Sequence, residues 1–234
     1  MATLQSPQVG CKNGWVPTEQ TGSNPTQATM ADPSKLKLTY VHFSMFHKGK
    51  TNRLIDLVTE KMEKECDVPN IHKSVQGARM GEKVCVRRYG FLLLHDDKEL
   101  YCASLLEYTT IQTRWVPPKH RGKGYATLML QKISEMFESL PHHDHICPWI
   151  ISYNRMEGIN TRAGWVKNPN VNTRRGTGEL DPTVPEQHDW FPPWAEASYH
   201  AERNDEFARG FFREFQEFYD LHAKPTNLDL KVRL

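Results

Sequence analysis

The chain has 234 residues, which suits one substantial domain with extensions, and its 38% hydrophobic and 25% charged residues are ordinary for a globular protein. No stretch approaches the roughly 18 apolar residues that a membrane span needs, so we expect no membrane partner. The formal charge of +2, from 30 basic and 28 acidic residues, argues against nucleic acid as a partner.

The cysteine and histidine spacings predict no metal site and no disulfide framework. The five cysteines are scattered and have no C-x-x-C spacing, which favours a reducing compartment. The cluster His142-His143-Asp144-His145 is interpreted as a solvated loop, because adjacent loop residues rarely all point inward. No secretory signal is visible at the N-terminus, so a cytoplasmic location is expected.

The N-terminal third predicts a polar tail followed by a strand, a helix and further strands. Residues 1–35 are rich in Gln, Thr, Ser, Pro, Asn and Gly, which predicts a mobile tail. Alternation from Leu36 to His42 predicts a strand, and apolar spacings of three and four predict a helix over 50–66. A Pro- and Gly-containing connection follows. Residues 84–94 then supply one strand or two short ones, and a turn is expected at 95–98.

The central part predicts the strand, loop and helix on which the functional argument depends. Residues 99–116 are too long for one strand and are divided into two that meet near 107–110. Apolar residues at helical spacing predict a helix over 126–140, after a loop with two glycines. A buried strand at 146–153, a short helix at 155–162 and a strand beginning at Trp165 follow.

The C-terminal part is expected to interrupt this pattern. Residues 167–195 are rich in Pro, Asn, Thr and Gly and predict a long surface loop. A helix over 195–223 and a final strand over 228–234 follow, so 167–226 is an insertion within a domain that spans 36–234. The order of elements predicts an α/β sheet with helices packed on it.

The segment from Trp115 to Ala126 joins a predicted strand to the start of the strongest predicted helix. Free amides at a helix start, together with the positive end of the helix dipole, bind phosphate oxygens. Gly122 and Gly124 allow close approach of the backbone. The spacing fits neither the dinucleotide-binding loop nor the nucleotide triphosphatase loop.

The run Arg121-x-x-Gly124-x-Ala126, after an apolar strand that ends in Val116-Pro117, resembles the acyl-CoA-binding signature of the GNAT superfamily. The similarity covers about residues 36–166 and includes Arg162-Ala163-Gly164-Trp165. Pro117-Pro118-x-x-Arg121-Gly122-Lys123-Gly124-Tyr125-Ala126 also resembles fungal lysine acetyltransferase-like proteins. The resemblance implies a mixed, mostly antiparallel sheet, helices on both faces and a splayed strand pair.

The resemblance also implies a set of coenzyme-binding residues. The backbone of Arg114, Trp115 and Val116 would pair with the pantetheine arm, and Asn154 would face the coenzyme. The amides of the loop and first helical turn would hold the pyrophosphate: Arg121, Gly122, Lys123, Gly124, Tyr125, Ala126 and Thr127. Acetyl-CoA would be the cosubstrate, with no metal.

The proton-transfer groups are less well marked. An alkylammonium has a pKa of about 10.4, so the attacking amine must lose a proton. The position where some relatives carry a glutamate base is Thr110, and nearby Glu107 is the first candidate, with an exposed strand-end charge as the alternative. The tyrosine that the family often uses as the acid is replaced by Asn160. Tyr153, water or an unassisted thiolate are the options.

Two further segments have more than one interpretation. The aromatic run at 188–194 either lines an amine pocket or anchors the insertion. The phenylalanine stripe at 207–218 is interpreted as a face packed on the sheet. The sequence therefore predicts an N-acetyltransferase that acts on a primary amine of a small molecule or of a protein lysine. The alternative is a noncatalytic CoA-binding or interaction protein with the same fold. No feature indicates the oligomeric state.

Overall fold

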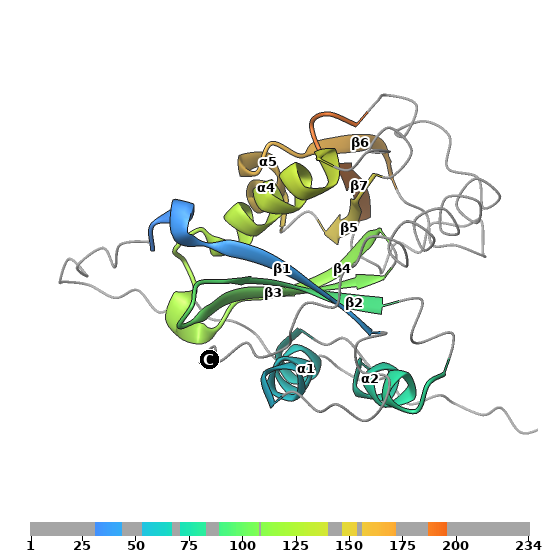
Figure 1. The fold of residues 1–234 in the computed structure, drawn as a ribbon. Helices are drawn as coiled ribbons and strands as arrows, with labels where there is room; N and C mark the ends of the chain where they lie inside the picture. The colour runs from blue at the N-terminus through green and yellow to red at the C-terminus, as the bar shows by residue number, and fades with distance from the viewer. Residues whose placement is uncertain are drawn as a thin grey trace, which may run out of the picture.

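A computed structural model of the chain describes residues 31–43, 53–66, 71–82, 89–107, 109–139, 147–153, 156–171 and 187–195. These ranges contain seven strands, four α-helices and two short 3-10 turns (Figure 1). Their bounds are η1 Pro33–Lys35, β1 Lys37–His42, α1 Arg53–Cys66, α2 Ile71–Arg79, β2 Tyr89–His95, β3 Leu100–Glu107, β4 Thr110–Trp115, η3 Pro118–His120, α4 Tyr125–Glu138, β5 Trp149–Tyr153, α5 Glu157–Arg162, β6 Val166–Val171 and β7 Gln187–Phe191.

The seven strands form one sheet in the order β1-β2-β3-β4-β5-β7-β6. Every neighbouring pair is antiparallel except β4 and β5, which run parallel. Helices cover both faces, with α1 and α2 on one side and α4 and α5 on the other (Figure 1). The expected mixed, mostly antiparallel sheet with helices on both faces is confirmed.

The two helical layers exist because the inner strands are apolar on both faces. Along β2, Leu92 and Leu94 belong to the cluster that contains α4, whereas Phe91 and Leu93 belong to the cluster that contains α1 and α2. Successive side chains of a strand point to opposite faces, so one continuous apolar run supplies both layers. A strand buried in this way needs no polar alternation.

The parallel pair β4 and β5 is the feature that positions the site. Registered pairs join only Thr110 to Trp149 and Ile111 to Ile150. The register of β4 against β3 also shifts between Leu105 and Leu106, as it does at a β-bulge. Beyond Ile111 the two strands are therefore not registered with each other, and the splayed pair that the resemblance implied is confirmed.

Several local expectations were wrong. The connection after α1 contains a helix, α2, whose Ile71, Val75 and Ala78 are buried against the sheet. Residues 167–195 are not a surface loop throughout, because β6 continues to Val171 and β7 runs through the sheet between β5 and β6. Residues 31–35, which were assigned to the tail, contain the turn η1.

Other expected elements lie outside the described residues. These are residues 1–30 of the tail, the strand residues 84–86, the cluster at 142–145, the helix over 196–223 with its phenylalanine stripe, and the strand over 228–234. Within the described ranges, no helix combines the length and the apolar character that crossing a bilayer would require.

Candidate functional site

A cleft of about 950 Å³ opens where β4 leaves β5. Its walls come from the end of α1, the second half of β4, the glycine loop, the first turn of α4, and α5 with the residue before it. The lining residues are Glu65, Cys66, Arg114, Trp115, Val116, Pro118, His120, Arg121, Gly122, Gly124, Tyr125, Ala126, Thr127, Met156, Ile159 and Arg162.

The floor of the cleft is a helix start that is suited to bind an anion. Gly124 caps α4 with a left-handed backbone at φ 86°, and no side chain caps the helix. The first amide with an intrahelical partner is that of Leu128, which donates to the Gly124 carbonyl at 3.0 Å. The first turn contains no acidic residue that could compete with a ligand anion.

Gly122 widens this floor. Its φ is 75°, in the region that glycine adopts without strain, and a Cβ placed there would meet no atom within 4 Å. The missing side chain thus leaves open space at this point of the cleft lining. An anion of phosphate size can approach the backbone at this point.

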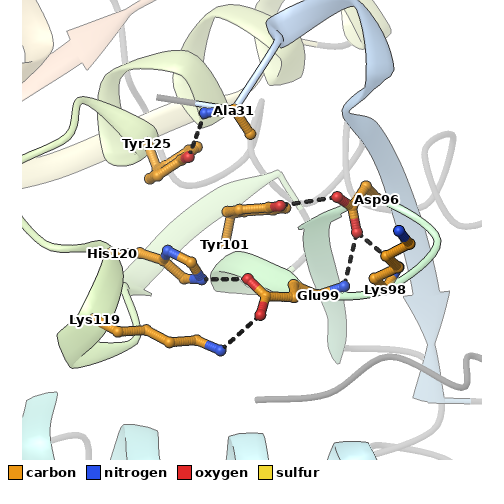
Figure 2. Close-up of polar contacts among 8 residues, drawn as sticks. All are labelled: Ala31, Asp96, Lys98, Glu99, Tyr101, Lys119, His120 and Tyr125. Carbon is orange, nitrogen blue, oxygen red and sulfur yellow. Dashed lines mark hydrogen bonds and ion pairs between the residues drawn. The ribbon is translucent and has the colours of Figure 1, made fainter. Parts of the chain in front are cut away.

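Aromatic and acidic side chains support the loop from the β2–β3 turn (Figure 2). The hydroxyl of buried Tyr125 accepts a hydrogen bond from the Ala31 amide at 2.8 Å. The Tyr101 ring lies 4.8 Å from that of Tyr125 and 4.6 Å from that of His120, between centroids. The Tyr101 hydroxyl donates to Asp96 at 2.8 Å, so the loop is fixed to a hydrogen-bonded turn.

His120 lies between this aromatic group and the cleft. It is 6% exposed, and its Nε2 lies 3.2 Å from Oε2 of Glu99 (Figure 2). Both ring nitrogens are buried and neither makes a hydrogen bond of good geometry among the described residues, so the contact with Glu99 is one of charge proximity. Burial lowers the pKa of His120 below its ordinary value, which nearby Glu99 opposes. The neutral imidazole is therefore favoured.

Glu65, at the end of α1, ties β4 to the loop. Its carboxylate accepts a hydrogen bond from Nε1 of buried Trp115 at 2.9 Å and forms an ion pair with Arg121. The hydrogen bond from Trp115, reinforced by Arg121, lowers the pKa of Glu65. Glu65 is the one carboxylate that lines the cleft in the described part of the chain, and it is a weak base.

The backbone of β4 beside the cleft is partly engaged by side chains. The Arg114 carbonyl accepts a weak hydrogen bond from Cys66 Sγ at 3.7 Å, and the Val116 carbonyl accepts one from Arg121 Nε at 3.1 Å. A carbonyl oxygen has two lone pairs, so either group can accept a further donor. The strand retains the capacity to bind an extended ligand.

The Arg114 side chain, which lines the cleft, is hydrogen-bonded to Asn160 of α5, which lies behind the lining residues. Both Nη atoms of Arg114 lie 3.2 Å from Oδ1 of Asn160, which is 0% exposed. Burial lowers the pKa of Arg114 to about 10. The amide nitrogen of Asn160 is buried and has no hydrogen-bond partner among the described residues.

The cleft brings together nine of the eleven residues predicted to bind the coenzyme: Arg114, Trp115, Val116, Arg121, Gly122, Gly124, Tyr125, Ala126 and Thr127. Lys123 lies within the loop but does not line the cleft, and Asn154 is outside the described residues.

The two residues proposed for proton transfer are not among those that line it. Glu107 accepts a hydrogen bond from Gln112 Nε2 at 2.7 Å and is paired with Thr110, beside the point where β4 and β5 meet. Tyr153 ends β5 opposite Gln187, and its side chain is not described.

Sequence reasoning missed the contributions of α1 and His120. Glu65 and Cys66 are a charged residue and a thiol at the end of an amphipathic helix, and no local pattern connects them to a loop more than 50 positions later. His120 directly precedes Arg121, so its place beside the motif was the only available signal. The other lining residues that were not predicted include Ile159 and Arg162 of α5 and Met156, which directly precedes it.

The aromatic run at 188–194 anchors the sheet instead of lining the cleft. Trp190 is 3% exposed and packs in the cluster with α4, and Trp194 Nε1 donates to Ser134 Oγ at 2.9 Å. His188 Nδ1 lies 3.1 Å from the Asn168 carbonyl oxygen. Of the two interpretations that the sequence left open, the structure supports the anchor.

The histidine, cysteine and acidic side chains do not gather into a metal site in the part of the chain that the structure describes. No group of three or more His, Cys, Asp or Glu side chains that could hold a metal ion occurs in the ranges described above. Cys66, Cys102 and Cys147 are free thiols, and burial raises the pKa of each of them.

Comparison with known proteins gives only a distant likeness. No protein-family model matches the sequence, and no curated protein matches it. Among solved structures, a mutant of the spermidine N-acetyltransferase SpeG from Vibrio cholerae is 10% identical with a TM-score of 0.45, over 68% of this chain and 93% of that one. A Bacillus subtilis acetyltransferase in complex with CoA is 10% identical with a TM-score of 0.42, over 68% and 98%. At these values the likeness does not assign a function, which has to be argued from the cleft.

Proposed function

We propose that this chain is an acyl-CoA-dependent N-acyltransferase of the GNAT type, with acetyl-CoA as the cosubstrate. One observation carries the proposal: an uncapped helix start without first-turn acidic residues lies at the end of a strand that separates from its parallel neighbour. The helix start suits a diphosphate, and the unregistered part of β4 suits an extended amide-containing arm.

The part of β4 that is not registered with β5 is long enough to contact an extended ligand. From Ile111 to Val116 the strand advances five residues, which is roughly 16 Å of extended backbone. A coenzyme with its diphosphate on the amides of 122–127 would thus run along β4 toward the meeting point of β4 and β5. Its thioester would lie in the cleft, near the part of the sheet where an acceptor amine has to approach.

The reaction would be attack of a neutral amine nitrogen on the thioester carbonyl carbon. The nitrogen loses a proton, the C–S bond breaks, and the sulfur leaves with the electron pair. Glu107, beside the strand junction, is the proposed base, either directly or through water. The acceptor is a primary amine of a small molecule or of a protein lysine, and the proposal extends to both.

A noncatalytic CoA-binding protein is the second candidate. The observation that favours it is that Glu65, the carboxylate that lines the described cleft, is held by Trp115 and Arg121 and is a weak base. Thiol release from acetyl-CoA, measured with a panel of polyamines, amino acids and lysine peptides, separates the two. Turnover with any amine supports the acyltransferase, whereas binding without thiol release supports the second candidate.

The coenzyme site can be tested with two glycine variants. Gly122→Ala places a methyl group in this open space of the cleft lining, so CoA affinity in calorimetry should fall about tenfold or more. Gly81→Ala is the matched control, because Gly81 also has a positive φ, 81°, but lies beyond α2 and away from the cleft.

Both variants should lose about 1 kcal/mol of stability from the strained backbone, so only the change in affinity is diagnostic. If the unmodified chain shows no heat of binding with CoA or acetyl-CoA, the proposed function is wrong. If Gly122→Ala and Gly81→Ala bind CoA equally well, the diphosphate is not at this loop.

A further inference from the structure

Arg114 is an arginine in a cleft wall with no carboxylate partner among the described residues. Both of its recorded hydrogen bonds go to the neutral Oδ1 of Asn160. Arg114 is half-buried, and a guanidinium that is partly withdrawn from water normally pairs with an anion, because an uncompensated charge is costly to bury. A second donor, the Asn160 amide nitrogen, is buried beside it without an acceptor. The Arg114 guanidinium and the Asn160 amide are thus two neighbouring hydrogen-bond donors with no anionic acceptor among the described residues.

The position of Arg114 shows which charge they can receive. It lies past Ile111, in the part of β4 that is not registered with β5, and it lines the cleft. The free amides of the α4 start lie farther along the chain and would take the diphosphate of the coenzyme, and its third phosphate, on the ribose, lies on the far side of the diphosphate from the cleft interior. The remaining coenzyme group that becomes anionic is the sulfur, which acquires charge when the C–S bond breaks.

We propose, on the basis of the function above, that the Arg114 guanidinium stabilises the thiolate of the departing coenzyme, and that Asn160 holds the guanidinium in place. In this step the amine nitrogen bonds to the acyl carbon and its proton passes to a base or to water. The C–S electron pair remains on sulfur, and the thiolate leaves paired with Arg114 and takes its proton from solvent after release. Asn160 acts as a positioning residue.

This arrangement gives Asn160 a role that does not require it to donate a proton. An asparagine amide cannot protonate a leaving group, but its oxygen can orient a guanidinium, as both 3.2 Å contacts show. A cation that is fixed before the reaction lowers the cost of the developing charge without transferring a proton. The same cation would repel an alkylammonium, which favours an acceptor that reacts as the neutral amine.

The test is to titrate the thiol of bound CoA by its thiolate absorbance. The desulfo analogue of CoA, bound to the same protein, is the blank that cancels the protein's own cysteines. A cation close to the sulfur should raise the acid dissociation constant of the bound thiol about tenfold or more over that of free CoA. In Arg114→Met this increase should disappear while CoA still binds, and Arg114→Lys should retain part of it.

Arg162→Met is the control for the overall positive charge of the cleft, because it removes an exposed guanidinium that lines the same cleft. It should change the titration less than Arg114→Met does. Asn160→Ala, which removes the orienting oxygen, should give an intermediate value. The wild-type titration needs no variant, so the proposal stays testable even if Arg114→Met does not fold.

Failure of the two proposals looks different. If CoA does not bind at all, the proposed function is wrong. If CoA binds but its thiol titrates as it does free in solution, or titrates identically in Arg114→Met, the role of Arg114 is wrong and the acyltransferase proposal stands. An arginine that served an acceptor carboxylate would give this second result.

Discussion

The buried imidazole of His120 lies beside the glycine loop and is surrounded by charged and aromatic side chains. Five titratable groups face it: Glu99, Lys119, Lys123, Tyr101 and Tyr125. Glu99 attracts the protonated ring, the two lysines repel it, and the tyrosine rings exclude water. Protonation of His120 would therefore place a charge beside the strand–loop junction in a site that favours the neutral form.

The lowered pKa of His120 makes stability depend on pH. The unfolded chain binds the proton near the ordinary pKa of 6.5, and the folded chain binds it only at lower pH. The contribution of His120 to stability is thus complete above about pH 6.5 and is lost as the pH falls toward the folded-state value. Urea unfolding at about pH 7.5 and about pH 5.5 should show that His120→Gln loses less stability on acidification than the unmodified chain.

His72→Gln is the control for this comparison, because His72 is an exposed histidine on α2 that bonds to Glu63. It leaves the surroundings of His120 intact, so the loss of stability that His120 causes on acidification should remain. An equal loss of stability on acidification in His120→Gln and in the unmodified chain would refute the role given to this histidine.

At the scale of elements, the strand β7 lies in a segment that the sequence predicted to be a surface loop, and it contributes buried side chains to the core. It occupies the interior of the sheet between β5 and β6, and Trp190 packs against the layer of α4. Trp190→Ala should therefore lower the free energy of unfolding by about 3–5 kcal/mol in urea denaturation.

Val166→Ala on the neighbouring strand β6 is the matched control, because Val166 is an apolar strand residue that is 45% exposed. It should change the free energy of unfolding by about 0.5 kcal/mol or less. A cost below about 1 kcal/mol for Trp190→Ala would show that β7 is not part of the stable sheet.

The elements that the sequence predicted well are those with a strong local signal. The helix α4 and the division of 99–116 into β3 and β4 follow from apolar spacing and from length alone. The strand β7 was missed because His188, Asp189 and flanking prolines resemble a loop, and its burial depends on strands far away in the chain. The helix α2 was missed because Gly77 and nearby polar residues conceal the buried positions Ile71, Val75 and Ala78.

The site shows the same division between local and distant information. The loop from Arg121 to Thr127 is contiguous, so the sequence could predict a phosphate site there. The contacts of Glu65 with Trp115 and Arg121 span 50 and 56 positions, and that of Arg114 with Asn160 spans 46. Contacts of this kind require the fold, because no spacing rule connects such residues.

At the scale of the whole molecule, the cleft is shared by both helical layers. Glu65 and Cys66 come from α1 on one face of the sheet, and Ile159 and Arg162 come from α5 on the other. A ligand in the cleft would contact both layers at once. Ligand binding should therefore reduce local unfolding in both helical layers.

Hydrogen exchange with and without CoA tests this expectation. At a CoA concentration of about 100 times Kd, binding should add about 2.7 kcal/mol to stability. Exchange should slow in peptides from both Arg53–Cys66 and Glu157–Arg162, and Gly122→Ala at the same CoA concentration should reduce both effects. Slower exchange confined to the loop at 121–127 would show that the ligand does not join the layers.

The short register between β4 and β5 has a mechanical consequence. Among the described residues, only two registered pairs join the strands β1 to β4 to the strands β5, β7 and β6. The helix α4 also joins the two halves, because it packs in one apolar cluster with Leu92 of β2 and Trp190 of β7. Because so few backbone pairs join the two halves, the packing of α4 supplies most of the contact between them. We expect substitutions that loosen the packing of α4 to change the width of the cleft, because residues of β4, α4 and α5 line it together.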